Sequence, residues 1–152
     1  MPGTADPLEP LRAVVEKSIP FVAHSGVVVE VLARGHARMR MPLEPNRNHV
    51  GSMYAGALFT LAELSGGAIF LSSFDRQRFY PVVRDMSIRF RRPATSDIWV
   101  EVRVDEEVVR KVQAEAEAAG KADYEWECEL KGADGTVVAI TKNSYQLRKV
   151  GT

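Results

Sequence analysis

The chain has 152 residues, a length that suits one domain with a proper hydrophobic core. Its twenty Lys and Arg residues balance its twenty Asp and Glu residues, so the formal net charge is zero. This balance shows neither the basic excess that predicts nucleic-acid binding nor an acidic tail. We therefore expect no nucleic-acid partner.

The single cysteine, Cys128, cannot form an internal disulfide, which fits a reducing compartment. The first residues, Met-Pro-Gly-Thr-Ala-Asp-Pro, lack the basic and apolar regions of a signal peptide. Both observations predict a cytoplasmic protein.

The N-terminal segment is predicted to form a short tail and one helix. We expect residues 1–5 to be disordered. Asp6 followed by Pro7 is typical of a helix start, with Asp6 as the N-cap. Residues 6–18 are therefore expected to form a helix whose apolar stripe packs on the domain, and Pro20 is expected to end it.

Two strands are predicted to follow. Residues 27–33 are rich in β-branched side chains, and Arg34-Gly35 marks a turn. In residues 36–41 apolar side chains alternate with His and Arg. This pattern predicts a hairpin with one buried face.

Residues 46–74 contain the longest apolar stretch, interrupted after Arg47 by a single carboxylate, Glu63. A helix that is apolar on all sides is normally buried, either in a core or in a membrane. A charge in the middle of a lipid-embedded segment is costly, and Gly66-Gly67 would loosen the helix. We therefore predict a core helix and no membrane span, with Ser52 as the candidate N-cap.

The pattern of the next segment changes twice. Alternation over residues 86–90 and 98–104 predicts two strands. Residues 105–120 are typical of a helix, because acids fill the first turn and Gly120 closes it. The apolar stripe expected for this helix consists of Val108, Val112, Ala116 and Ala119.

Two more strands are predicted at the end of the chain. Apolar and charged residues alternate over 122–131, a Gly-rich turn follows, and residues 136–148 form the last strand. Pairs of strands around one long apolar helix predict a single α+β domain over residues 1–152. Its curled antiparallel sheet would wrap around that helix.

The residues around the core helix resemble a known family, the acyl-CoA thioesterases of the hotdog fold. The resemblance is to the phenylacetyl-CoA and 4-hydroxybenzoyl-CoA thioesterase type, in an uncharacterised branch, and it covers about residues 19–148. In that family an Asn or Gln precedes a loop, His-Gly-Gly opens a long helix, and Asp or Glu follows about two turns later. Here Asn48 matches the amide and Glu63 matches the acid, while residues 54–56 read Tyr-Ala-Gly. Residues 105–120 would then be an inserted helix, either a lid or decoration.

The resemblance implies a thioester hydrolase. Glu63 would attack the thioester carbonyl or activate water, and partial burial should raise its pKa. Asn48 would hold the water or the thioester, although Asn48 and Asn46 also suit a purely structural loop turn. The first-turn N–H groups of Ala55 and Gly56 would stabilise an oxyanion. Gly56 equally suits close packing of the helix on the sheet.

Five further residues are expected to contact substrate. His49 is a candidate ligand contact or proton carrier, or an ordinary loop histidine. Tyr54 stands where the family has His. Arg89, Arg91 and Arg92 precede Pro93 on a strand that borders the coenzyme A channel in the family. Arg suits phosphate, although a solvated strand face would also explain these side chains.

The resemblance also implies the partners. The substrate would be an acyl-CoA or acyl-carrier thioester, with coenzyme A present only as part of the substrate and no other cofactor. The family pairs sheets edge to edge, so we expect a homodimer or a dimer of dimers with sites between subunits. No metal-spaced Cys/His cluster is present. The altered helix start also permits a non-catalytic acyl-binding protein, whereas hotdog dehydratases use a His-centred motif that is absent here.

Overall fold

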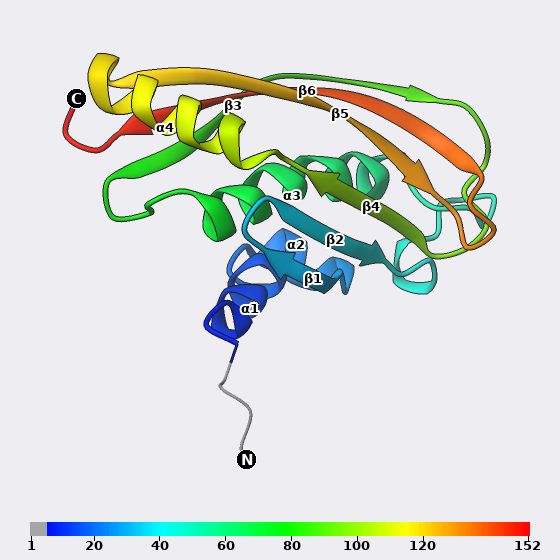
Figure 1. Cartoon of the computed structure of the whole chain (residues 1–152). Helices are drawn as coiled ribbons and strands as arrows, with labels where there is room; N and C mark the ends of the chain where they lie inside the picture. The colour runs from blue at the N-terminus through cyan, green and yellow to red at the C-terminus, as the bar shows by residue number, and fades with distance from the viewer. Residues whose placement is uncertain (1–5) are drawn as a thin grey trace.

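A computed structural model describes residues 6–152, so the tail expected at residues 1–5 lies outside the described residues. Figure 1 shows a curled antiparallel sheet that covers one long helix. The elements in chain order are α1 (Glu9–Lys17), α2 (Pro20–Ser25), β1 (Val28–Ala33), β2 (His36–Met41), η1 (Glu44–Asn46), α3 (Ala55–Ser73), β3 (Phe79–Phe90), β4 (Ile98–Arg103), α4 (Glu106–Ala119), β5 (Lys121–Lys131) and β6 (Val137–Lys149). The strand order in the six-stranded sheet is β1-β2-β4-β5-β6-β3. This arrangement confirms the predicted α+β architecture.

Helix α3 is the core element. Eleven of its nineteen residues are buried, among them Leu61, Ala62 and Ile69, which are fully enclosed. The helix packs against β1 to β6 and against α1. Its length and composition alone would also suit a membrane span. In this fold the apolar side chains instead contribute to the core that the sheet covers (Figure 1).

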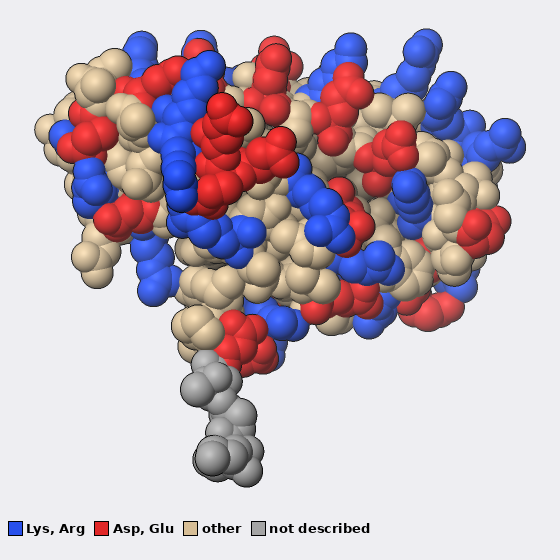
Figure 2. Space-filling model, viewed as in Figure 1, with Lys and Arg blue, Asp and Glu red and all other residues tan. Residues whose placement is uncertain are grey.

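The predicted alternation along the strands is confirmed. In β2 the residues Ala37, Met39 and Met41 face the core, and the intervening basic residues lie partly exposed. Strand β5 follows the same rule, because every second residue from Ala122 to Leu130 faces inward and its acids face outward. Figure 2 shows the outcome on one face of the molecule, where acidic and basic side chains are intermingled.

The N-terminal region differs from the prediction. Asp6 accepts a hydrogen bond from the Leu8 N–H, but α1 begins only at Glu9 and ends at Lys17. Pro20 does not simply follow the end of a helix. It opens α2, because proline at a first helical position sacrifices no hydrogen bond. The prediction of one helix over residues 6–18 therefore missed a second, short helix.

Three other boundaries differ. Ser52 is not the N-cap of α3, which begins at Ala55 after Tyr54 and has no side-chain cap. Strand β3 starts seven residues before the predicted alternation, at Phe79, because pairing with β6 extends it. Helix α4 buries Val112 and Ala116 as predicted, but its third buried residue is Val109, whereas Val108 and Ala119 are exposed.

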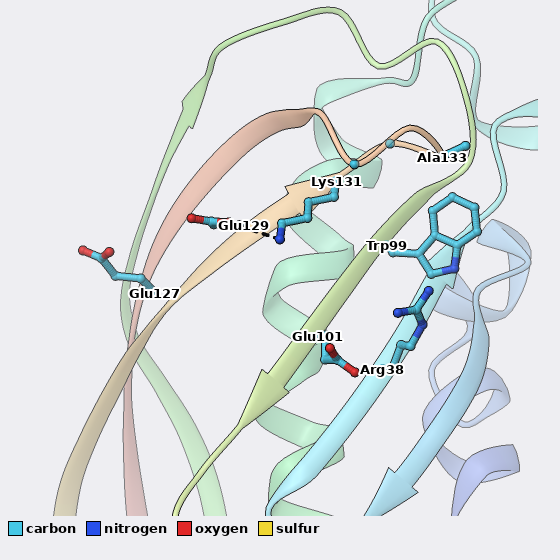
Figure 3. Close-up of a pocket in the computed structure, with 9 residues that line it drawn as sticks. Arg38, Trp99, Glu101, Glu127, Glu129, Lys131 and Ala133 are labelled. Atoms are coloured by element: carbon cyan, nitrogen blue, oxygen red, sulfur yellow. Dashed lines mark ion pairs between the residues drawn. The ribbon is translucent and has the colours of Figure 1, made fainter.

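The sheet opens between β4 and β5. These strands pair only at Trp99 and Lys131, whereas β5 pairs with β6 along its whole length. A pocket of about 560 Å³ lies over this opening, where Trp99 and side chains of β2 and β4 face side chains of β5 (Figure 3). Its charges have neighbours of opposite sign, such as Lys131 beside Glu129 at 3.5 Å. This pocket contains none of the predicted site residues.

Candidate functional site

A loop closed by Asn48 leads into α3. The Asn48 Oδ1 accepts hydrogen bonds from the N–H groups of Val50 at 2.9 Å and Ser52 at 3.2 Å, and its Nδ2 donates to the Ser52 Oγ at 3.0 Å. Asn46 holds a different part of the loop, because its Nδ2 donates to the carbonyls of Ser25 and Pro42. The amide of Asn48 therefore stabilises the loop in this structure, as expected if Asn48 is a structural loop-turn residue.

The first turn of α3 has two free N–H groups. The N–H groups of Ala57 and Leu58 donate to the carbonyl of Tyr54. Those of Ala55 and Gly56 have no acceptor within residues 6–152. Free N–H groups at the positive end of a helix suit a negatively charged oxygen. The N–H groups of Ala55 and Gly56 are therefore not committed to another group of the described chain.

A pocket of about 380 Å³ lies at this helix start. Its lining residues come from the loop, from the first turn of α3 and from the end of β3 with the segment after it: Asn48, Ser52, Met53, Ala55, Leu58, Phe90, Arg91, Arg92, Pro93 and Ala94. The Met53 N–H donates to the Ala94 carbonyl at 2.8 Å and ties these segments together. The pocket therefore brings together Asn48, Ala55, Arg91 and Arg92.

Glu63 lies outside this pocket. It follows Ala55 by eight residues, about 12 Å along the helix axis. Its carboxylate is partly buried and makes no hydrogen bond or ion pair within residues 6–152. Burial raises the pKa of Glu63 above its usual range. One turn on, a Cβ added to Gly67 would meet nothing within 4 Å, so the space beside Gly67 is open.

The remaining predicted residues surround the helix start. The Tyr54 ring is 59% exposed, yet it lies so close to Gly56 that a Cβ there would be 2.5 Å from the ring. His49 is exposed and does not line the pocket. Arg89, like the two arginines of the pocket, is exposed and has no ion pair among the described residues. Of the predicted residues, Asn48, Ala55, Arg91 and Arg92 thus line the pocket, and Glu63 lies apart from it.

Three polar residues of β6 were not predicted as part of the site. Thr141, Asn143 and Tyr145 are buried beneath the sheet, and two of them donate hydrogen bonds to the backbone of α3 beside Glu63. The sequence carried a partial signal, because polar residues at every second position of the last strand share one face, and that face lies toward either the solvent or the core. Alternation alone does not decide which face is buried.

Comparisons with known proteins establish the family. Residues 9–146 match the family described as Domain of unknown function (DUF4442). The chain belongs to this family. DUF4442 is part of the thioesterase-like hotdog set, which confirms the predicted resemblance and the hotdog fold. None of the curated proteins matches the chain.

Solved structures extend the comparison of this DUF4442 chain. A Pseudomonas aeruginosa protein of unknown function, described as a probable thioesterase, is 54% identical over 95% of this chain and 97% of its own, with a TM-score of 0.91. A candidate thioesterase from Shewanella oneidensis is 27% identical over 91% of this chain and 95% of its own, with a TM-score of 0.71. A variant thioesterase from Pseudomonas aeruginosa, 19% identical over 97% of this chain and 98% of its own, shares the fold with a TM-score of 0.72.

Proposed function

We propose that this chain hydrolyses acyl-CoA or acyl-carrier thioesters, with Glu63 as the base or nucleophile. The observation that carries the proposal is a partly buried carboxylate without a hydrogen-bond donor or cation within the described residues. Glu30, which is also partly buried, differs from Glu63 because Arg38 and Arg40 neutralise it. An acid that burial penalises and no partner stabilises is a candidate for function. Relatives described as thioesterases support the reaction class.

The chemistry follows from these groups. As a base, Glu63 takes a proton from water while the water oxygen bonds to the thioester carbonyl carbon. The C–S bond then breaks, and the leaving thiolate receives the proton. As a nucleophile, Glu63 would itself bond to the carbonyl carbon and release the thiolate. Water would then hydrolyse the resulting anhydride. In both routes the N–H groups of Ala55 and Gly56 would stabilise the oxyanion.

We propose that two copies of the chain complete the site. Glu63 and the pocket at Ala55 lie about 12 Å apart along one helix, too far to act on one carbonyl. Strand β3 is an edge strand, and it packs beside α3. Exposed apolar residues lie on both elements or just before α3: Tyr54, Phe59, Tyr80, Val83 and Phe90. A homodimer, alone or paired again, with β3 beside β3 would cover this surface. It would also bring Glu63 of one copy near Asn48 of the other.

The arginines suggest how the carrier is held. Arg91 and Arg92 line the pocket at the helix start, and Arg89 lies close by, near the end of β3. None of the three is engaged by an acid within residues 6–152, so their guanidinium groups remain available for phosphate. Coenzyme A or a phosphopantetheine carrier would supply those phosphates, and no other cofactor is needed.

Two observations favour a second function, acyl binding without catalysis. The Tyr54 ring lies over Gly56, and the amide of Asn48 is occupied by its own loop. Both features would obstruct an oxyanion site unless the loop and ring move when substrate binds. The chain would then bind thioesters without cleaving them.

A panel of acyl-CoAs with detection of free thiol, run on wild type and Glu63→Gln, tests the proposal. Glutamine keeps the shape but removes the base, so the rate should fall by about a hundredfold or more. The wild-type rate should rise with pH through the raised pKa of Glu63, because the base must be ionised. Equal rates for both proteins would overturn the role of Glu63. Binding of a non-hydrolysable acyl-CoA analogue without any turnover would favour the acyl-binding function.

A further inference from the structure

Strand β6 places three polar side chains in the core. Thr141, Asn143 and Tyr145 occupy alternate positions and are at most 2% exposed. The Thr141 Oγ1 donates to the Asn143 Oδ1, and the Asn143 Nδ2 donates to the Tyr145 hydroxyl, both at 2.7 Å. Burial raises the pKa of Tyr145 to about 12, so its hydroxyl stays protonated at any ordinary assay pH. These three residues form a connected chain of hydrogen bonds, called the β6 network below.

The β6 network ends on the backbone of α3 at Glu63. The Asn143 Nδ2 donates to the Ala62 carbonyl at 3.1 Å, and the Tyr145 hydroxyl donates to the Glu63 carbonyl at 3.3 Å. These carbonyls belong to the two peptide groups that flank the Cα of Glu63. Elsewhere on α3, within residues 6–152, a side chain of another element reaches the backbone only at Ser73, the last residue of the helix. Mid-helix carbonyls already have partners in the helix, so these extra donors are not needed for helix formation.

Two more features hold the same turn. Gly66 leaves room for the Tyr145 ring, since a Cβ there would be 2.3 Å from its Cε1. The Ser65 Oγ donates to the Ala62 carbonyl and accepts a hydrogen bond from the Trp126 Nε1 at 3.1 Å. The backbone on either side of Glu63 is therefore tied to both β5 and β6.

A buried polar network is costly in a core that apolar side chains could fill, because any group left unpaired has lost its hydration without compensation. Side-chain hydrogen bonds have strict geometry, however, and fix a helix in rotation and along its axis more tightly than apolar contacts do. A general base must stay within a few tenths of an ångström of its working position. The β6 network acts on the one turn of α3 where such accuracy serves the proposed chemistry.

We propose that Asn143 and Tyr145 are positioning residues that hold Glu63 in register for thioester hydrolysis. This inference rests on the proposed function. Neither residue touches substrate, and both act through the peptide groups beside Glu63. The β6 network therefore affects the rate of the chemical step and leaves substrate binding unchanged.

Tyr145→Phe tests the proposal, with Tyr124→Phe as a matched control. Both tyrosines are buried and their ring centroids lie 5.5 Å apart, but the Tyr124 hydroxyl has no hydrogen-bond partner within residues 6–152. Tyr145→Phe should lower kcat by about tenfold, because small misplacements of reacting groups are expensive, and leave KM within about twofold. Tyr124→Phe should leave both constants unchanged. Melting curves of both variants check that each melting midpoint lies well above the assay temperature. The folded fraction in the assay is then equal for the two variants.

The remaining outcomes separate the two proposals. Suppose that Glu63→Gln abolishes turnover but Tyr145→Phe has the same kcat as Tyr124→Phe. The positioning role of the β6 network is then overturned, and the proposed hydrolysis by Glu63 stands. If Glu63→Gln retains the wild-type rate, or wild type cleaves no thioester, both proposals fail together at Glu63. Should Tyr145→Phe be poorly folded, Asn143→Ser is measured in the same way. It should lower kcat at constant KM, and an unchanged kcat would overturn the proposal.

Discussion

The two sides of α3 differ in how completely their packing and hydrogen-bonding needs are met. On the side that faces β5 and β6, the Tyr145 ring fills the space beside Gly66. Backbone carbonyls there accept hydrogen bonds from Asn143 and Tyr145. At Gly67 the helix instead faces open space, and the Glu63 carboxylate one turn earlier has no partner among the described residues. One side of the helix is thus built for stability and accuracy, and the other is left open for chemistry or for a partner. Residues that are adjacent in the sequence serve opposite needs.

Gly66 and Gly67 give the sharpest test of this difference. Gly66→Ala forces a Cβ against the Tyr145 ring and should destabilise the fold by about 1–3 kcal/mol, the usual cost of overpacking. Gly67→Ala meets nothing and should stabilise it by up to about 1 kcal/mol, because alanine favours a helix. Urea denaturation at concentrations where the monomer dominates measures both changes. Equal effects would show that the two sides of α3 do not differ as described.

The open side can also be tested as an interface. Phe59 lies on α3 one turn before Glu63 and is 38% exposed. Phe59→Asp should weaken self-association by at least about tenfold, because an aspartate would lose its hydration when the surface is covered. Analytical ultracentrifugation measures the change, and Val108→Asp on α4 is the matched control at another exposed apolar position. A wild-type monomer at micromolar concentration would remove the proposed dimer.

The smallest predicted effect concerns Glu63 and pH. Burial raises the pKa of Glu63 in the folded chain, so the folded state holds the proton more tightly than the unfolded state does. This contribution to stability is complete below the ordinary Glu pKa and is lost as pH rises through the raised value. Glu63→Gln should therefore have a higher Tm than wild type at pH 7.5, and the difference should disappear near pH 3.5.

Calorimetry at the two pH values checks this prediction, with Glu125→Gln on the exposed face of β5 as the control. A stabilisation of Glu63→Gln that is the same at both pH values would contradict it. The cause would then be packing and not the charge of the carboxylate.

The sequence by itself determined most of the fold. The strict alternation of β5 permits only a strand with one buried face, and the long apolar run of α3 permits only a buried helix. Both elements were therefore predicted correctly. Glu63 was identified as a candidate because a lone carboxylate in such a run is physically unusual. These inferences succeed because hydrophobic periodicity is a local property of the chain.

Only the tertiary structure decided the rest. Val109 is buried in α4 in preference to Val108 because the position of β5 selects the face of the helix. The inward direction of Asn143 and Tyr145 depends on which side of β6 meets α3, and that follows from pairing with β3 and β5. Glu63 and the pocket at Ala55 are separated along one helix, and the pairing that we propose across two copies would depend on a sheet edge. Contacts between segments far apart in the chain set these features, and no local pattern encodes them.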